Sequence, residues 1–337
     1  MYCSVIIPAQ NARRTISECI LAVLSQSVPR DLYEVIVVDA GSSDATAAIA
    51  RSHGVRVIPR PPIGMAAARN IGARAARGEI LLFLDPDCIP ALDWIAQMIA
   101  PFADPSVVAV KGAYQTHETA LLPRLIQAEY EDAYQRLAEA NAGEIVGTYS
   151  AAYRRSAFLA AGGFDPTLAS MEDVDLSLRL ARSGQRVVFA PKARVYHAHG
   201  THLRHYVARM LRRGLWRPLV YARHPDRPLG QSPASDEVRT QIRLAALAVA
   251  SALLGSRWQR LRPIAGIFLA IFTSTTVPFA WRARRAGTDV AVASPFLIFV
   301  RALALGAGLA IGNASLIGRQ AVDQVARAVR IFRIMGS

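Results

Sequence analysis

The stretch Ile80-Leu81-Leu82-Phe83-Leu84-Asp85-Pro86-Asp87 decides the fold class. Its apolar residues run together without polar alternation, and two carboxylates follow them directly. Such a run is typical of a strand buried on both faces, in a parallel sheet covered by helices. Similar short β-rich runs alternate with helix-like stretches over the first 110 residues. The sequence therefore predicts an α/β domain with a doubly wound, mostly parallel, Rossmann-like sheet, whose ligands bind beyond the carboxyl ends of the strands.

The expected elements are bounded by glycine, proline and aspartate residues between the apolar runs. Strands are predicted at 4–8, 33–39, 55–58, 80–85 and 107–111, and helices at 12–24, 44–52, 65–77 and 92–102. Later in the chain, the pattern predicts an amphipathic helix over 119–139, a loop and strand over 143–153, a helix over 171–182, a strand pair over 186–195 that Pro191 interrupts, and an arginine-rich helix over 204–221. We expect a domain over 1–222, a proline-rich linker over 223–240 and a membrane-associated helical region over 241–337.

Charge divides the chain of 337 residues into two unlike parts. Residues 1–200 carry 19 basic and 20 acidic side chains, whereas residues 201–337 carry 20 arginines and 5 acidic side chains. A hydrophobic fraction of 52% excludes a disordered protein. Three cysteines are too few for a disulfide framework and fit a reducing compartment. Because the first apolar run is too short for a secretory signal, we expect residues 1–200 to lie in the cytosol.

The late arginines border long apolar runs. Residues 263–281 contain no charge, and residues 290–318 contain only Arg301, so both runs are candidate membrane spans. Arginines beside such runs fit lipid headgroups better than a nucleic acid backbone, and we expect no nucleic acid partner. The uncharged run 244–256 is too short to span alone, which leaves a re-entrant hairpin or interfacial helices open. Arg301 is expected to face protein or water or to snorkel. Residues 319–333 predict an amphipathic helix, interfacial or packed on the first domain.

Carboxylates follow two of the predicted strands. Asp39 ends the second strand, where it can accept a hydrogen bond from a nucleobase or ribose, or serve as a structural cap. Asp85 and Asp87 end the fourth strand, and two carboxylates beside a buried strand are costly unless a cation binds them. Oxygen ligands select Mg²⁺ or Mn²⁺, which in turn bridge phosphates. A solvated turn is the alternative to this cation site.

Three acidic residues, Glu172, Asp173 and Asp175, open the helix predicted at 171–182. The helix dipole favours acids in a first turn, but one of them can also serve as a general base for an attacking hydroxyl. Arg69 precedes the strand that ends at Asp85, and an arginine there can bind phosphate through both terminal nitrogens.

Imidazole and guanidinium groups gather after the last predicted strand. Four histidines, at positions 197, 199, 202 and 205, occur at short spacings that can bind transition metals, but a separate zinc site is not favoured. The following helix presents four arginines to lipid phosphates, to an acceptor pyrophosphate or to solvent; they are Arg204, Arg209, Arg212 and Arg213.

In their order and spacing, these motifs resemble the family-2 inverting glycosyltransferases of GT-A fold. The resemblance covers about residues 1–215, and the layout with apolar helices after the first domain is similar to the membrane-associated members that build exopolysaccharide or lipid-linked glycans. The matching segments are Val5–Ala9, Val37–Asp44, Gly64 with Arg69-Asn70-x-Gly72, Asp85-Pro86-Asp87 and Glu172–Leu176.

The resemblance implies a metal-dependent transfer of a sugar from a nucleotide-diphosphate donor, in the first place a UDP-sugar, to an acceptor hydroxyl. The implied acceptor is a glycan or lipid-linked glycan at the cytoplasmic face of the cell membrane. By the same resemblance Asp173 is the catalytic base, with Glu172 beside it. Donor residues are implied as well: Asp39 for the base, Pro8 and Ala9 lining its pocket, Asp85 on the ribose side, and Asp87 for Mn²⁺ or Mg²⁺ on the diphosphate. The resemblance also allows one histidine near the metal or the diphosphate, and His197 is the one expected there.

Two departures from the family pattern limit what the resemblance implies. Ala40 stands where the family often has a second aspartate, which leaves the donor base open. Residues 212–216 only loosely match the motif of processive members, which disfavours a polymerising synthase. The alternatives are a polyprenyl-phosphate sugar transferase, a nucleotidylyltransferase, for which the glycine-rich loop after the first strand is missing, and a membrane scaffold with a degenerate catalytic domain.

Overall fold

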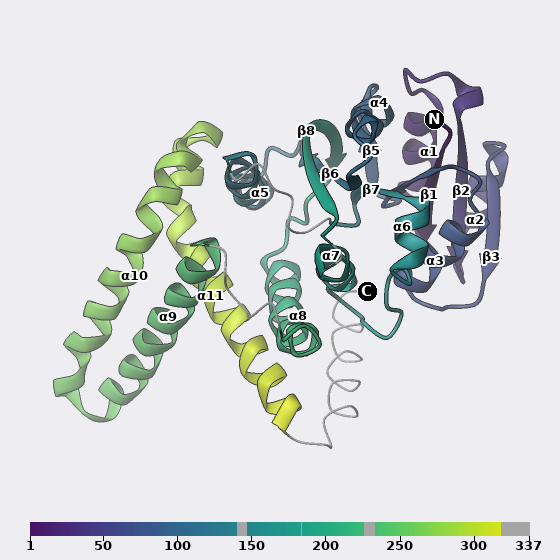
Figure 1. Cartoon of the computed structure of the whole chain (residues 1–337). Helices are drawn as coiled ribbons and strands as arrows, with labels where there is room; N and C mark the ends of the chain where they lie inside the picture. The colour runs from purple at the N-terminus through teal and green to yellow at the C-terminus, as the bar shows by residue number, and fades with distance from the viewer. Residues whose placement is uncertain (140–146, 183, 226–232, 318–337) are drawn as a thin grey trace. The chain divides into compact units, whose positions relative to one another are not determined.

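The computed structural model describes residues 1–139, 147–182, 184–225 and 233–317 (Figure 1). The chain forms two compact units. The sheet domain comprises residues 1–118 and 133–199, and the helical unit comprises residues 119–132 and 200–337. This division differs from the predicted domain over 1–222, because the segments 119–132 and 200–222 fold with the C-terminal helices.

Within the described residues, eight strands form one mixed sheet: β1 (Cys3–Ala9), β2 (Tyr33–Ala40), β3 (Arg56–Arg60), β4 (Ile80–Leu84), β5 (Cys88–Pro90), β6 (Val107–Gln115), β7 (Ser150–Arg154) and β8 (Arg186–His197). Their order is β3-β2-β1-β4-β7-β6-β8-β5. Pairing is parallel for β1 with β2 and β4, for β2 with β3, and for β6 with β8. β7 is antiparallel to β4 and β6, and β5 to β8. The predicted α/β class with a mostly parallel sheet is confirmed.

The central strands are buried along their whole length, as their unbroken apolar runs predict. Phe83 of β4 packs against the rings of Phe158 and Phe164, each with its centroid 5.3 Å away. At Gly72, a Cβ would come within 2.4 Å of the Ile6 side chain, so glycine lets its helix lie directly on β1. The helices of this domain are α1 (Ile16–Leu24), α2 (Thr46–Ser52), α3 (Met65–Ala75), α4 (Trp94–Ile99), α6 (Arg155–Ala160) and α7 (Glu172–Arg182), with 3₁₀ turns at Arg30–Leu32 and Ala100–Ala103.

One strand departs from its prediction. The predicted strand pair at 186–195 is a single strand, β8, because Pro191 falls where the pairing with β6 shifts register. Lys111 pairs with Phe189 and Ala113 pairs with Arg194, so the residues around Pro191 are left out of the ladder. Proline lacks a backbone N–H and is tolerated at such irregular points. The three-residue strand β5 and the short helix α6 were not expected from the sequence.

The helical unit is built from long helices. α5 (Leu121–Glu139) begins in this unit and ends in the sheet domain. The others are α8 (Leu203–Ala222), α9 (Pro233–Arg257), α10 (Arg262–Ala283) and α11 (Thr288–Ile317), with 3₁₀ turns at Gln259–Leu261 and Arg284–Ala286. α9 starts inside the predicted linker over 223–240, since proline is well suited to the first turn of a helix.

Among the described residues, three segments are long and apolar enough to cross a membrane: Asp236–Arg257, Gln259–Ala286 and Thr288–Leu316. They include the span predicted at 263–281 and residues 290–316 of the span predicted at 290–318, and they add a third around the run 244–256, which was predicted to be too short. Residue 318 and the amphipathic helix predicted over 319–333 lie outside the described residues.

Candidate active site at the strand ends

The ends of β1 and β2 bring a buried carboxylate to the edge of the sheet. Asp39 is the register partner of Ala9, and both Pro8 and Ala9 are buried. Asp39 is 6% exposed, and within the described residues its Oδ1 atom has no hydrogen-bond partner. The chain then turns at Gly41, whose φ is +78°. Because a buried acceptor without a donor is costly, Asp39 marks a position where a ligand can supply one.

Arg69 on α3 is the centre of a buried ion-pair cluster. Its Nη2 donates to Asp85 Oδ1 at 2.7 Å, and its Nη1 donates to Glu172 Oε1 at 3.0 Å. The Arg69 side chain is 5% exposed, and the carboxylates come from the end of β4 and the start of α7. Both terminal nitrogens of Arg69 thus hold carboxylates within the protein, and its predicted binding of phosphate stays a prediction.

The start of α7 is electrostatically and conformationally strained. Burial raises the pKa of Glu172, and the neighbouring charge of Asp173 raises that pKa further, while Arg69 opposes both effects without cancelling them. Met171 precedes Glu172 with a φ of +67°, a left-handed conformation that residues other than glycine rarely adopt. Strained backbone of this kind is found preferentially at functional sites.

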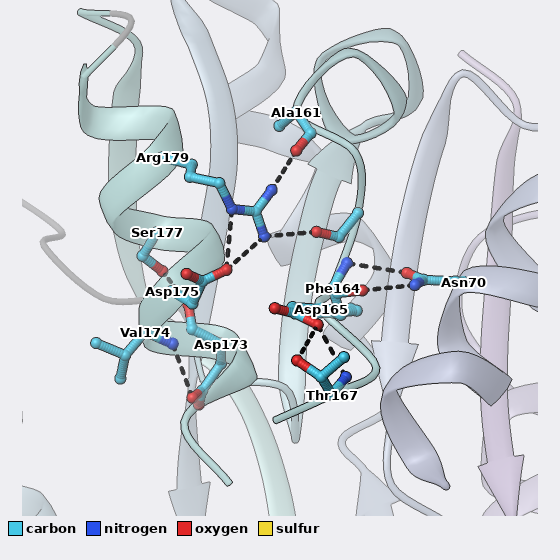
Figure 2. Close-up of polar contacts among 11 residues, drawn as sticks. Asn70, Ala161, Phe164, Asp165, Thr167, Asp173, Val174, Asp175, Ser177 and Arg179 are labelled. Carbon is cyan, nitrogen blue, oxygen red and sulfur yellow. Dashed lines mark hydrogen bonds and ion pairs between the residues drawn. The ribbon is translucent and has the colours of Figure 1, made fainter. Parts of the chain in front are cut away.

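Asp173 is held mainly through the backbone of its own helix (Figure 2). Its Oδ1 accepts the Val174 N–H at 2.8 Å, and its backbone carbonyl accepts the Ser177 hydroxyl at 2.7 Å. Its Oδ2 accepts no hydrogen bond from another described residue, and the side chain is half-buried. This geometry suits a carboxylate that accepts a proton from an incoming hydroxyl.

A second cluster supports the loop that leads to this helix (Figure 2). Arg179 Nε donates to Asp175 Oδ2 at 2.9 Å, and the same guanidinium donates to the carbonyl oxygens of Ala161 and Gly163. From α3, the Asn70 amide donates to the Phe164 carbonyl at 2.6 Å and accepts the Phe164 N–H at 2.9 Å. Asp175 therefore positions Arg179, which holds the loop before α7, and it is not a free acid. The sequence signal for this pair was the i,i+4 spacing of Asp175 and Arg179.

Asp87 and His197 meet beyond β4 and β8. His197 Nε2 lies 3.2 Å from Asp87 Oδ2, and its Nδ1 lies 3.1 Å from Nδ1 of the buried His199. Partial burial acts to raise the pKa of Asp87, but the hydrogen bond and charge of His197 outweigh it, so this pKa is lowered. The Tyr114 ring stacks on Tyr149 and lies 5.0 Å from His197. His199 and the two tyrosines were not predicted as site residues.

The metal-ligating groups of this site are few. In the described part of the chain, no group of three or more histidine, cysteine, aspartate and glutamate side chains is placed to hold a metal ion. Asp87 and His197 form a pair that would hold an ion together with groups of a substrate. A carboxylate and an imidazole suit Mn²⁺, and the carboxylate suits Mg²⁺.

The predicted site residues are thus only partly brought together. Arg69, Asp85 and Glu172 form one cluster, and Asp87 and His197 form a pair. The four predicted arginines lie on α8 in the helical unit. Arg204 and Arg212 are exposed, the Arg209 guanidinium lies over the Tyr206 ring, and Arg213 interacts with other groups of the protein. His202 and His205 also belong to the helical unit, where their rings lie 5.6 Å apart.

Comparison with known proteins agrees with this architecture. A family model described as Glycosyl transferase family 2 matches residues 4–160, and one described as Glycosyl transferase family group 2 matches residues 130–310. The mannosyltransferase PcManGT from Pyrobaculum calidifontis, solved in complex with GDP-Man and Mn²⁺, has a TM-score of 0.56 to this chain at 24% identity; the match covers 97% of this chain and 84% of that structure. The fold is therefore GT-A-like, a fold of sugar-transferring enzymes.

The chain belongs to glycosyl transferase family 2. The pre-mycofactocin glycosyltransferase of Mycobacterium tuberculosis is 34% identical over 214 residues, which are 57% of this chain and 43% of that protein. The O-antigen chain rhamnosyltransferase RfbN of Salmonella typhimurium is 26% identical over 212 residues, which are 59% of this chain and 67% of that protein. The chain spans less than half the length of the mycobacterial relative.

Proposed function

We propose that the protein transfers a sugar from a nucleotide-diphosphate donor to an acceptor hydroxyl, with inversion at the anomeric carbon. The observation that carries this proposal is the Arg69 cluster, which ties Asp85, at the end of a central strand, to Glu172, beside Asp173. One side chain thereby holds the donor-side carboxylate at the strand ends and the first turn of α7, which carries Asp173. Family membership and the relatives that act on glycans support the same assignment.

The donor side uses the strand ends. Asp39 Oδ1 accepts an N–H of the nucleobase, in a pocket bordered by Pro8 and Ala9. Asp85, whose Oδ1 is held by Arg69, presents its remaining oxygen to the ribose. We assign a UDP-sugar as donor, because uracil offers one imide N–H to a single carboxylate acceptor. The PcManGT structure contains GDP-Man, so guanine is the competing base to test.

Asp87 and His197 would hold Mn²⁺ or Mg²⁺. Their atoms lie 3.2 Å apart, and the lowered pKa of Asp87 keeps this carboxylate ionised at neutral pH. When bound, the ion supplies positive charge that offsets the charge of the departing diphosphate. A Mn²⁺ ion is present in the PcManGT structure.

Asp173 accepts the proton of the acceptor hydroxyl while the hydroxyl oxygen forms its bond to the anomeric carbon. The bond from that carbon to the diphosphate oxygen breaks on the opposite face, so the configuration inverts. Glu172 is fixed by Arg69 and sits beside Asp173, which orients the first turn of α7. A positioned general base of this kind accelerates proton transfer by about 10²–10⁴-fold.

The acceptor is a glycan or a lipid-linked glycan at the cytoplasmic face of the cell membrane. In the part of the chain that the structure describes, three helices are long and apolar enough to cross a membrane. The arginines beside them complement anionic headgroups, and the sheet domain has its cysteines buried and free, as expected for a reducing compartment. A lipid-linked acceptor is the kind of substrate that such an anchored enzyme meets.

The test uses detergent-extracted full-length protein with a panel of nucleotide sugars and Mn²⁺ or Mg²⁺. One donor should release nucleoside diphosphate in a metal-dependent manner, and Asp173→Asn should lower the rate by about 10²–10⁴-fold while donor binding is retained. Asp87→Ala should lose metal-dependent turnover. Asp31→Asn is the matched control and should behave as wild type, because it changes an exposed carboxylate in the 3₁₀ turn before β2. Near wild-type transfer by Asp173→Asn would refute the base assignment.

A further inference from the structure

We propose that α9 and α10 form the membrane-crossing hairpin of this protein, and that α11, although it is the most apolar helix, does not cross. The inference rests on the proposed membrane association and goes beyond it by assigning two crossings rather than three. The partner surface is a lipid bilayer, with the turn between α9 and α10 at the headgroups of the opposite leaflet.

The hairpin exposes its apolar side chains, whereas α11 uses more of its own for packing. In an apolar 18-residue stretch of each candidate span, the share of buried residues is 22% within Asp236–Arg257, 17% within Gln259–Ala286 and 33% within Thr288–Leu316. Figure 1 shows α9 and α10 running side by side as a hairpin. Large exposed apolar residues of this hairpin are Leu247, Val249, Leu253, Leu254, Ile264, Ile267, Leu269, Ile271, Val277 and Trp281.

The second half of α11 lies in backbone contact with α8. A Cβ added at Gly308 would lie 2.2 Å from the Leu211 carbonyl oxygen, and one at Gly312 would lie 2.4 Å from that of Leu215. On the other side of the contact, a Cβ at Gly214 would lie 2.4 Å from the Leu305 carbonyl oxygen. Only glycine allows two helices to approach so closely, and the contact extends over about two turns of each helix.

This contact ties α11 to an arginine-rich helix. α8 carries five arginines between residues 204 and 217, and Arg212 and Arg213 are exposed within the segment that contacts α11. If α11 crossed a bilayer, α8 would have to enter with it. An arginine at the bilayer centre costs about 2.5–3.5 kcal/mol even on the most permissive scale. The packing of α11 on α8 therefore opposes its insertion.

The first half of α11 is fixed by a buried polar network. Arg301 donates to Glu129 Oε1 at 2.8 Å and to Gln241 Oε1 at 2.9 Å, and the Tyr206 hydroxyl donates to Glu129 Oε2 at 2.9 Å. At its first turn, Asp289 pairs with Arg124 of α5. Both halves of α11 thus contact polar helices of the same unit, in addition to the packing of Phe299 on Phe272 of α10. Arg301 faces protein, one of the arrangements expected from the sequence.

The hairpin has the length and the charge pattern of a crossing. The uncharged run 263–281 of α10 measures about 28 Å at 1.5 Å per residue, close to the 30 Å of a hydrocarbon core. α9 has a shorter uncharged run, 244–256, but Arg243 and Arg257 at its ends have side chains long enough to reach the headgroups. The turn carries Arg257, Arg260 and Arg262, and an exposed Trp258.

The two ends of the hairpin also differ in positive charge. The end opposite the turn carries five arginines, Arg239, Arg243, Arg282, Arg284 and Arg285, against three at the turn. The larger number of basic residues favours the cytoplasmic side, so the turn faces away from the cytoplasm. Since α11 starts at the cytoplasmic end and does not cross, its C-terminal end stays on that side.

Single introduced cysteines test this arrangement, because the three native cysteines are buried and give a low background. Gln259→Cys reports on the turn, Asn313→Cys on the end of α11, and Ser52→Cys on the sheet domain; all three positions are exposed. Right-side-out and inside-out sealed membrane vesicles are prepared separately, and each is treated with a membrane-impermeant maleimide. Labelling after detergent extraction gives the total for each variant. The unmodified full-length chain gives the background.

We expect Gln259→Cys to react from the face opposite to Ser52→Cys, and Asn313→Cys to react from the same face as Ser52→Cys. Reaction of Asn313→Cys from the opposite face would overturn the inference in favour of three spans. Reaction of Gln259→Cys from the Ser52 face, or only after detergent, would overturn the crossing in favour of an interfacial or re-entrant hairpin. If the protein is absent from the membrane fraction, the proposed membrane association fails instead, which a sedimentation control shows separately.

Discussion

Two arginines, the buried Arg69 of the sheet domain and the partly buried Arg301 of the helical unit, make similar contacts with different consequences. Each donates to two side chains from other elements, at 2.7–3.0 Å for Arg69 and 2.8–2.9 Å for Arg301. Arg69 holds two carboxylates, whereas Arg301 holds one carboxylate and a neutral amide. Negative charge is therefore left over around Arg69 and balanced around Arg301. The proposed binding site for a cation and the proposed base therefore lie near the Arg69 cluster, where the charges of the cluster do not cancel.

Removing Arg69 should have the largest effect. In Arg69→Met, Asp85, Glu172 and Asp173 lose their shared cation, and breaking such buried pairs costs about 3–5 kcal/mol of unfolding free energy. The displaced first turn of α7 should lower kcat by about 100-fold, the size of effect expected from a misplacement of about 1 Å. Thermal unfolding and steady-state kinetics on the preferred donor measure both changes.

The matched control for this prediction is Arg74→Met, which changes an exposed arginine on the same helix. Arg69→Lys keeps one charge but loses the two-pronged geometry, so it should recover stability more than it recovers kcat. If Arg69→Met kept wild-type kcat in its folded fraction, Arg69 would have a structural role only, as Arg301 does.

Removing Arg301 should affect stability alone. Arg301→Met leaves the partly buried Glu129 without its cation, with the Tyr206 hydroxyl still donating to it, at a cost of at most about 3–5 kcal/mol. The double variant Arg301→Met with Glu129→Gln removes both charges and should recover most of that loss. Melting temperatures of the detergent-extracted proteins test the stability effect, and kcat per folded molecule should stay at the wild-type value in both variants. A kcat loss that the double variant does not recover would join Arg301 to the chemistry.

The two arginines also show which features of the structure could be predicted from the sequence and which could not. The apolar run 80–84 and the acids after it were sufficient to predict the central strand and the position of Asp85 and Asp87 at its end. Arg69 was predicted to belong to the site, but not its partners, because Glu172 is 103 residues away and only tertiary folding brings the two together. The same holds for Arg301 and Glu129, which are separated by 172 residues.

Local rules also failed where a short-range signal pointed the wrong way. Pro191 predicted a broken strand, but a register shift in the ladder accommodates it. The prolines of 223–240 predicted a linker, but Pro233 is the first residue of α9. Hydropathy ranks α11 first among the candidate spans, with a mean hydropathy of 2.0, although its glycines are packed on α8. Hydropathy measures the residues of one helix and carries no information about which neighbour covers them.

The smallest expected effect is a pH dependence of stability at Glu172. Its pKa in the folded state is raised above the ordinary value of 4.5, first by burial and then by Asp173. A raised pKa means that the folded state binds the proton more tightly than the unfolded chain does. The stability that Glu172 contributes is therefore present in full below pH 4.5 and is lost as pH rises through the raised pKa.

Glu172→Gln removes this titration while it keeps an oxygen for Arg69. Its melting temperature relative to wild type should rise as pH increases above 4.5, until Glu172 is fully ionised in the folded wild-type protein, and should then stay level. Glu79→Gln, which changes an exposed glutamate before β4, should show no such rise. A constant difference between Glu172→Gln and wild type over this range would mean that Arg69 neutralises Glu172 completely, and that the charge around Arg69 is as balanced as the charge around Arg301.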